Sequence, residues 1–387
     1  MTFDEQLRAA LAGKEAAAMR RCLRAVPDGV LDLASNDYLG LARHPEVTEA
    51  ACAAVREFGA GARASRLVSG HTTLHARLEC ELAGFKNCEA ALVFPSGYHA
   101  NLAVVSSLAR RGDVLFCDKR NHASLIDACR LASANGAIVR YFSAPERLRE
   151  LLENYAAKRR DERFFIVSDT IFSMDGDRAD VQCLAQCAAD FDAVQILDDA
   201  HGMGTLGAGG WGLESGKNQS PATSPQPPIL VGTLSKALGA QGGFVAGSRV
   251  LIDWLINTSR PFIYTTGLAP ASCGAALKSL EIVQREPQRR ARLREVTKKL
   301  ASGLRELGFE ARLQSSPIIP VIVGDAKAAV ALSAALCERG VWCPAIRPPT
   351  VPAGSSRLRV TANAALSDEE ITFALSAFGE AREALKL

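Results

Sequence analysis

Short apolar runs alternate with longer stretches of helical periodicity along most of the chain, and this alternation restricts the fold more than any other feature. The runs are rich in apolar or β-branched residues and lie at 90–94, 114–117, 137–142, 163–168, 193–197, 228–232 and 243–247. Such alternation is typical of a mostly parallel sheet with helices on both faces. We therefore expect an α/β fold with a seven-stranded sheet, whose functional side chains lie at the carboxyl ends of the strands.

The pattern changes near residue 290, where a charged helical stretch precedes two further apolar runs at 316–324 and 356–361. This change predicts a separate, smaller α+β domain at the C-terminus. We expect an N-terminal arm over 1–45, a large domain over 46–285 and the small domain over 286–387. The proline-rich segment 216–228 has few large apolar residues, so we expect it to be a surface loop.

The composition excludes several classes of protein. Of 387 residues, 48% are hydrophobic, which suits a sizeable core. Lys and Arg total 45 against 42 Asp and Glu, and no basic block occurs, so we expect no nucleic-acid partner. No uncharged apolar run approaches the length of a membrane span, and the early acids Asp4 and Glu5 do not suit a secretory leader. We expect a globular cytoplasmic protein without a membrane partner.

The cysteine pattern supports the same compartment. The sequence has 11 cysteines, an odd number without paired spacing, which indicates reduced thiols. The nearest pair, Cys183 and Cys187, fits one face of a helix better than half of a zinc site. We therefore expect no metal.

Lys236 is the only charged residue in the segment 232–243, whose other residues are mostly small. One interpretation is a solvent-exposed loop lysine with glycines that serve only the turn. The other is a lysine that forms a Schiff base with a flat cofactor, which small neighbours allow to approach the backbone.

An acid and a histidine follow the apolar run at 193–197. Side chains alternate along a strand, so Asp198 and Asp199 should face opposite sides, with His201 just past the end. A carboxylate and an imidazole at such an edge suit a heteroaromatic cofactor. The alternative is a capping aspartate and an ordinary loop histidine.

The stretch "FPSGYHAN" predicts an anion site, because the run at 90–94 leads through Ser96, Gly97 and Tyr98 into a helical pattern. Free backbone N–H groups and the positive end of the helix dipole would hold a phosphate there, with the hydroxyl of Thr233 as a further contact. A simple strand-to-helix turn is the alternative.

The segment 202–207, "GMGTLG", satisfies G-x-G-x-x-G and raises a remote alternative, an NAD-dependent oxidoreductase. The context disagrees, because "DDAH" separates the motif from the strand and no acid follows about 20 residues later.

Taken in order, the motifs identify a resemblance. "SNDYLGL", "GARASRLVSGHTTLHARLE", "SGYHAN", "DKRNHASLIDA", "FSMDGD", "DDAHGMGTLG", "GTLSKALGAQGG" and "RPPTVPAGSSRLRVT" run from about residue 33 to 361. In this order they resemble the α-oxoamine synthase family of fold-type I pyridoxal-phosphate enzymes. The resemblance implies pyridoxal 5'-phosphate as cofactor and a homodimer with shared active sites.

The resemblance also assigns roles around the cofactor. Lys236 would bond it and then act as the base, Asp198 would pair with the pyridinium nitrogen and His122 would stack on the ring. His201 and Ser173 would bind near the phenolic oxygen. The phosphate would be held by Gly97, Tyr98 and Thr233, with Thr265 or Thr266 reaching it from a second subunit.

For the substrate, the resemblance implies contacts from His122, Arg347, Thr350 and one N-terminal arginine, for which we favour Arg20 over Arg21. The arginine at 347 suits a bidentate contact to a carboxylate.

Within the family, the sequence is most similar to the acyltransferases of biotin biosynthesis. These condense L-alanine with a pimeloyl thioester, on coenzyme A or acyl carrier protein, to give 8-amino-7-oxononanoate, CO2 and free thiol carrier. The traits are Gly202 after His201, the segment 345–354 and the compact length. Relatives that use glycine or another acyl-CoA, of the 2-amino-3-ketobutyrate CoA ligase or 5-aminolevulinate synthase type, are the alternative. Asp169 stands where the family commonly has glutamate.

Overall fold

The computed structural model describes residues 1–206 and 227–387. The predicted loop at 216–228 therefore falls almost wholly outside the described residues. The chain forms two compact units. The larger unit contains Leu39–Ser173 and Asp177–Ala291, and the smaller contains Met1–Tyr38, Met174–Gly176 and Arg292–Leu387. The proposed domain limits at 45 and 285 stay a prediction.

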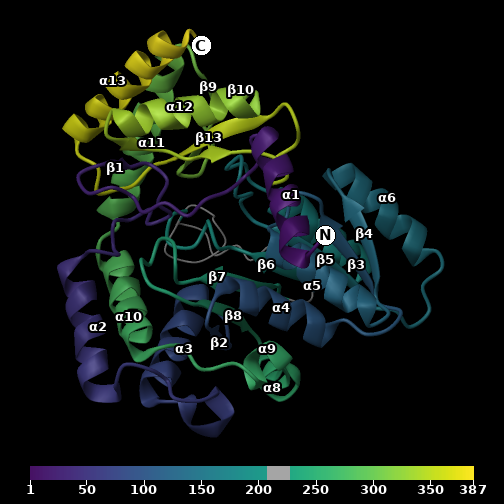
Figure 1. Ribbon diagram of the computed structural model, residues 1–387. Helices are drawn as coiled ribbons and strands as arrows, with labels where there is room; N and C mark the ends of the chain where they lie inside the picture. The colour runs from purple at the N-terminus through teal and green to yellow at the C-terminus, as the bar shows by residue number, and fades with distance from the viewer. Residues whose placement is uncertain (207–226) are drawn as a thin grey trace. The chain divides into compact units, whose positions relative to one another are not determined.

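The larger unit is built on a seven-stranded sheet in the order β2-β8-β7-β6-β5-β3-β4, as Figure 1 shows. Strand β8 is antiparallel to both of its neighbours and the other pairs are parallel, so the predicted mostly parallel sheet is confirmed. The strands are β2 (Ala90–Phe94), β3 (Val114–Asp118), β4 (Ile138–Phe142), β5 (Phe164–Asp169), β6 (Ala193–Asp198), β7 (Ile229–Thr233) and β8 (Gly243–Gly247).

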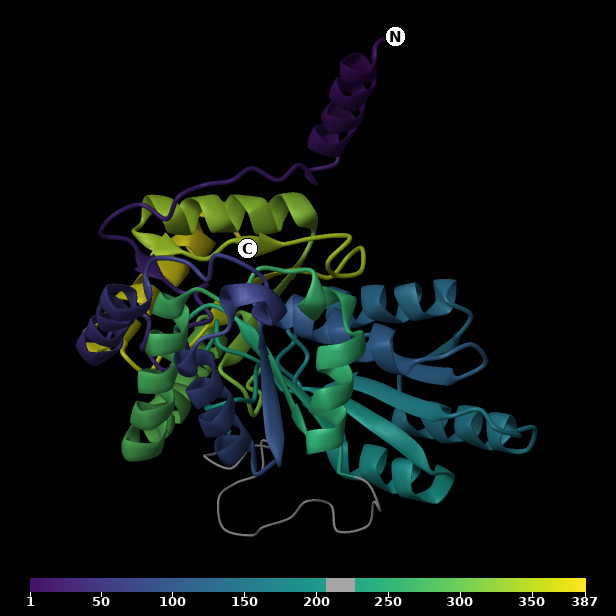
Figure 2. The same cartoon turned by 90° about the horizontal axis from the view of Figure 1, so that it is seen from below.

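Helices cover both faces of this sheet, as the turned view in Figure 2 also shows. One face packs against α4, α5 and α8, and the opposite face is covered in part by α7, which contacts β5 and β6. The helices are α2 (Pro45–Phe58), α3 (Thr73–Lys86), α4 (Gly97–Leu108), α5 (Ala123–Ala134), α6 (Pro145–Ala156), α7 (Val181–Phe191), α8 (Arg249–Thr258), α9 (Arg260–Ile263) and α10 (Pro270–Arg285).

The core beneath α4 and α5 explains where the functional side chains emerge. It takes every second residue of the central strands, including Phe165 and Val167 of β5, Ile196 of β6 and Val231 of β7. Because side chains alternate along a strand, the same face continues at the carboxyl ends with Asp169, Asp198 and Thr233. The apolar pattern of the strands thus directs these polar groups to one face.

The smaller unit has the expected α+β character. Its four-stranded sheet has the order β12-β13-β10-β9, and a separate parallel pair joins β1 to β11. The elements are α1 (Phe3–Ala16), β1 (Leu31–Asp32), α11 (Gln288–Glu306), which begins in the larger unit, β9 (Glu310–Ala311), β10 (Ile318–Gly324), α12 (Ala326–Glu338), β11 (Val341–Trp342), β12 (Ala345–Ile346), β13 (Ser356–Thr361) and α13 (Asp368–Leu385). Among the helices of the described residues, none has the length and apolar character that a membrane crossing requires.

Candidate active site

A cavity of about 220 Å³ lies in the larger unit at the carboxyl ends of its central strands. It brings together most of the site residues expected there from the sequence, namely Gly97, Tyr98, His122, Asp198, His201, Thr233 and Lys236. It is also lined by Ser96, which the sequence placed in the turn of the anion site. The other lining residues, which sequence reasoning did not assign to the site, are Asn101, Ser124, Asp169, Ala200 and Ser235.

Asp198 ends β6 on the cavity face and is only 6% exposed. The side-chain amide of Asn101, on α4, donates to its Oδ2 at 2.6 Å, and the backbone N–H of Ala200 donates to its Oδ1 at 2.9 Å. The same Asn101 amide donates to Ser124 at 2.8 Å. Both carboxylate oxygens are therefore held in place from within the protein.

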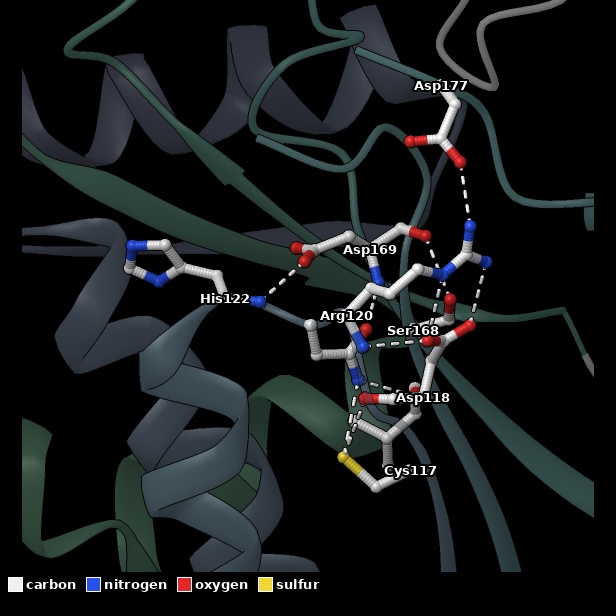
Figure 3. Close-up of polar contacts among 9 residues, drawn as sticks. Cys117, Asp118, Arg120, His122, Ser168, Asp169 and Asp177 are labelled. Atoms are coloured by element: carbon white, nitrogen blue, oxygen red, sulfur yellow. Dashed lines mark hydrogen bonds and ion pairs between the residues drawn. The ribbon is translucent and has the colours of Figure 1, made fainter. Parts of the chain in front are cut away.

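His122 is the N-cap of α5, and its ring faces away from the carboxyl that binds its backbone (Figure 3). Its Nδ1 lies 2.8 Å from the Ser124 hydroxyl, and its ring packs edge-on near that of Tyr98. Burial lowers the pKa of His122; the Asp198 charge opposes this and the Lys236 charge reinforces it. A lowered pKa favours the neutral imidazole, which is suited to lie against an aromatic ring.

The N-terminus of α4 lies at the cavity, where the sequence predicts an anion site. Ser96 is its N-cap, and the first turn begins at Gly97, where a side chain would meet Thr233 only at an ordinary 3.6 Å. The Thr233 hydroxyl lies 2.7 Å from that of Ser235. The Tyr98 hydroxyl donates to Asp127, which raises the pKa of the tyrosine. Helix amides and hydroxyls thus meet where a phosphate would fit.

Lys236 follows β7 in a tight turn and lines the cavity, so it is not simply a lysine on an open loop. The Gly239 N–H donates to the Lys236 carbonyl at 2.9 Å. Gly239 has φ +58°, and a side chain there would overlap the backbone of Ala42. The backbone of this turn therefore requires a glycine at 239, whatever the role of Lys236.

The segment after β6 explains the first two glycines of the G-x-G-x-x-G motif, and the third, at 207, lies outside the described residues. Residues 200–205 form turns rather than a helix. A Cβ at Gly202 would overlap the Asp199 carboxylate, and Gly204 has φ +73°. His201 lies in this segment, 6% exposed and lining the cavity. The described part of the motif, 202–206, is thus a compact turn and not the strand-to-helix entry of a dinucleotide site.

Asp199 faces away from the cavity side of β6, as expected. Its Oδ2 lies 2.6 Å from the Nζ of Lys86, at the end of α3, and its Oδ1 accepts from Thr170 at 2.7 Å. The Lys86 side chain is 0% exposed. Sequence reasoning missed this buried ion pair, whose partners are 113 residues apart.

The remaining expected residues lie elsewhere. Ser173 belongs to the larger unit but is not among the described residues that line the cavity. Residues 265 and 266 also belong to the larger unit, and Thr266 pairs with Ser65 in an isolated β-bridge. The roles of all three stay predictions.

Apart from His122, which lines the cavity, the expected substrate residues lie in the smaller unit. Arg347 donates to the carbonyls of Ala18 and Arg20. Arg21 donates to the Thr350 hydroxyl at 2.8 Å, whereas the Arg20 guanidinium pairs with Glu15. The two N-terminal arginines therefore differ in their partners, and their part in substrate binding stays a prediction.

Comparison with known proteins agrees with this arrangement. A family model described as aminotransferase class I and II matches residues 28–378. The chain is 43% identical over 378 residues to a putative 8-amino-7-oxononanoate synthase of Bacillus licheniformis, covering 98% of this chain and 97% of the relative. It is 45% identical over 390 residues to an 8-amino-7-oxononanoate synthase of Methylococcus capsulatus, covering 98% and 99%. A solved structure of SPT with a PLP internal aldimine matches with a TM-score of 0.90 at 26% identity, covering 100% of both chains.

Proposed function

Because the chain belongs to the aminotransferase class I and II family, we propose that it is a pyridoxal-phosphate-dependent acyltransferase of the 8-amino-7-oxononanoate synthase type. The reaction condenses L-alanine with a pimeloyl thioester, on coenzyme A or acyl carrier protein, and releases 8-amino-7-oxononanoate, CO2 and the free thiol carrier. This is a step of biotin biosynthesis. The relatives with this name match the chain over nearly their whole length, which supports the assignment.

The observation that carries the proposal is the set of groups around one cavity: an amine, a carboxylate held by neutral donors, a neutral imidazole and a helix N-terminus flanked by hydroxyls. This donor set fits pyridoxal phosphate, whose aldehyde, ring nitrogen, ring face and phosphate each require one of these groups. The cavity is lined by Gly97 and Thr233 at the N-terminus of α4, which offers the phosphate a place. When bound, the cofactor supplies a ring that accepts the electron pair left when the substrate loses a proton or carboxylate.

The protein's own groups then divide the work. Lys236 would bond the cofactor and move the proton at the α-carbon of the amino acid. Asp198, held by Asn101 and Ala200, would keep the ring nitrogen protonated, and His122 would stack on the ring. His201 and Ser173 would bind near the phenolic oxygen.

The substrate contacts follow from the same assignment. We propose that Arg347, Thr350 and an N-terminal arginine bind a substrate carboxylate, and that the protein is a homodimer with shared active sites. The contact between Arg21 and Thr350 makes Arg21 a candidate beside Arg20.

The proposal is tested by crossing amino acids with acyl thioesters and measuring free coenzyme A. L-Alanine with pimeloyl-CoA should react fastest and yield 8-amino-7-oxononanoate by mass spectrometry. Lys236→Ala should abolish turnover, while Lys278→Ala, which removes a half-buried lysine outside the cavity that is paired with Glu281, should not. Faster release of coenzyme A with glycine and a shorter acyl-CoA would instead assign the protein another α-oxoamine synthase activity.

A further inference from the structure

Asp169 lines the cavity but has no role in the chemistry described so far. It is the last residue of β5, 2% exposed, and lies opposite Asp198 in the register of the parallel pair β5–β6. Its Oδ2 accepts the backbone N–H of His122 at 2.6 Å, the bond drawn in Figure 3. The carboxyl therefore connects the end of β5 to the N-cap residue of α5.

The loop that carries His122 is fixed from two sides. Asn121 accepts the Asp169 N–H at 2.8 Å and donates to the Val167 carbonyl at 2.8 Å, which ties the loop to β5. On the other side, Arg120 pairs with Asp118 and Asp177, as Figure 3 shows. The bonds of Asn121 and Arg120 hold the loop, and the bond to the Asp169 carboxyl holds the backbone of His122 itself.

The carboxyls at this edge differ in their partners. Asp118 pairs with a guanidinium, and Asp198 receives two donors, one on each oxygen. Asp169 receives one N–H and forms no ion pair with any residue in the described ranges. Two buried carboxyls on adjacent strand ends do not both ionise readily, and the proton goes to the one with fewer donors.

From this geometry we propose that Asp169 is a positioning residue that holds His122 against the cofactor site, and that it does so as an uncharged carboxylic acid. The acid's carbonyl oxygen accepts the His122 N–H. Because the acid is uncharged, it places no second negative charge beside Asp198. Burial and then the Asp198 charge raise the pKa of Asp169 well above its usual value. The neighbouring His122 N–H and the Lys236 charge oppose this rise, and Cys117 adds to it. The part of this proposal that concerns the cofactor rests on the proposed function.

The sharpest variant is Asp169→Asn, which has the shape and hydrogen-bonding pattern of the protonated acid. In infrared difference spectra near neutral pH, the wild type should show a protonated-carboxyl band that Asp169→Asn lacks, with or without cofactor. Asp118→Asn should keep the band, because the carboxyl it removes is paired with Arg120. A wild-type spectrum without this band would overturn the proposal.

Stability against pH gives a second readout. A carboxyl whose pKa is raised in the folded state stabilises that state fully below its unfolded pKa and loses the contribution as pH rises toward the folded pKa. Between about pH 4.5 and about pH 7, the wild type should therefore lose stability relative to Asp169→Asn. A wild-type stability that stays constant relative to the variant over this range would mean that Asp169 is already ionised in the folded protein, and it would overturn the proposal.

Cofactor affinity tests the positioning role. Asp169→Asn should bind pyridoxal phosphate within about twofold of the wild type, whereas Asp169→Ala, which leaves the His122 N–H unpaired, should bind about tenfold more weakly. If Asp169→Ala does not fold, Asp169→Asn alone tests the proposal. If Asp169 acted as an anion, Asp169→Asn would also bind the cofactor more weakly than the wild type. A wild type that fails to bind the cofactor would count against the proposed function, and the infrared and pH readouts would still test the protonation of Asp169.

Discussion

Asp198 and Asp199 are neighbours at the end of one strand and both are buried, but they differ in what surrounds them. Asp198 is 6% exposed and Asp199 1%. Asp198 faces the cavity and is held by the neutral donors of Asn101 and Ala200, whereas Asp199 faces the other way and pairs with Lys86. A carboxylate that is held only by neutral donors can use its negative charge to bind a ligand. One paired with a buried ammonium stabilises the fold.

The largest expected effect comes from breaking the structural half of this comparison. Lys86→Met should lower the free energy of unfolding by about 3–5 kcal/mol, because the buried Asp199 carboxylate loses its partner. Urea denaturation measures the change. The double variant Lys86→Met with Asp199→Asn should recover much of it. A single variant within about 1 kcal/mol of the wild type would mean that the pair does not hold the fold.

The functional half should respond in activity. Asp198→Asn should reduce turnover about 10²–10³-fold, because the charge facing the ring nitrogen is lost, while the free energy of unfolding changes by about 1 kcal/mol or less. Steady-state kinetics and urea denaturation on the same preparation separate the two effects. Asp199→Asn should show the reverse pattern, since it leaves Lys86 unpaired. Equal losses of stability in both variants would erase the distinction.

Gly202 tests how closely the Asp199 carboxylate packs against the turn that carries His201. Gly202→Ala should destabilise the protein by about 1–3 kcal/mol, because the methyl group would overlap that carboxylate. Thermal unfolding measures the cost. Gly61→Ala is the matched control, because nothing lies within 4 Å of a Cβ there. An unchanged melting temperature for Gly202→Ala would mean that the turn adjusts freely.

The smallest expected effect sharpens the role of the neutral donors. Asn101→Ala removes the amide that bonds Asp198 and Ser124, and it should weaken cofactor binding about tenfold. Fluorescence titration with pyridoxal phosphate gives the dissociation constant. Asn257→Ala, which removes an exposed bond to Asp253, should leave that constant unchanged. Equal affinity in both variants would show that Asp198 does not depend on Asn101.

The sequence predicted those features that depend on local periodicity. The alternation of strands and helices gave the sheet, and the period of two placed Asp198 and Asp199 on opposite faces. The transition from β2 into α4 at Gly97 also follows the sequence prediction, and the anion site there stays a prediction. The motif order identified the family.

The features that were missed depend on packing between distant segments. Asn101 reaches Asp198 only because α4 lies on the face where β6 presents that carboxylate. The partnership of Lys86 and Asp199 joins the end of a helix to a strand 113 residues away, and no local pattern encodes it. Asp169 could have been suspected, because the apolar residues Phe165 and Val167 already indicated its face.

The central claim, that this cavity holds pyridoxal phosphate bonded to Lys236, is tested most directly by mixing the protein with the cofactor, reducing with borohydride and mapping the peptides by mass spectrometry. The account predicts one phosphopyridoxyl adduct, on Lys236. A control sample that is not reduced should show no adduct at this lysine. An unmodified peptide at Lys236, or an adduct confined to other lysines, would contradict it.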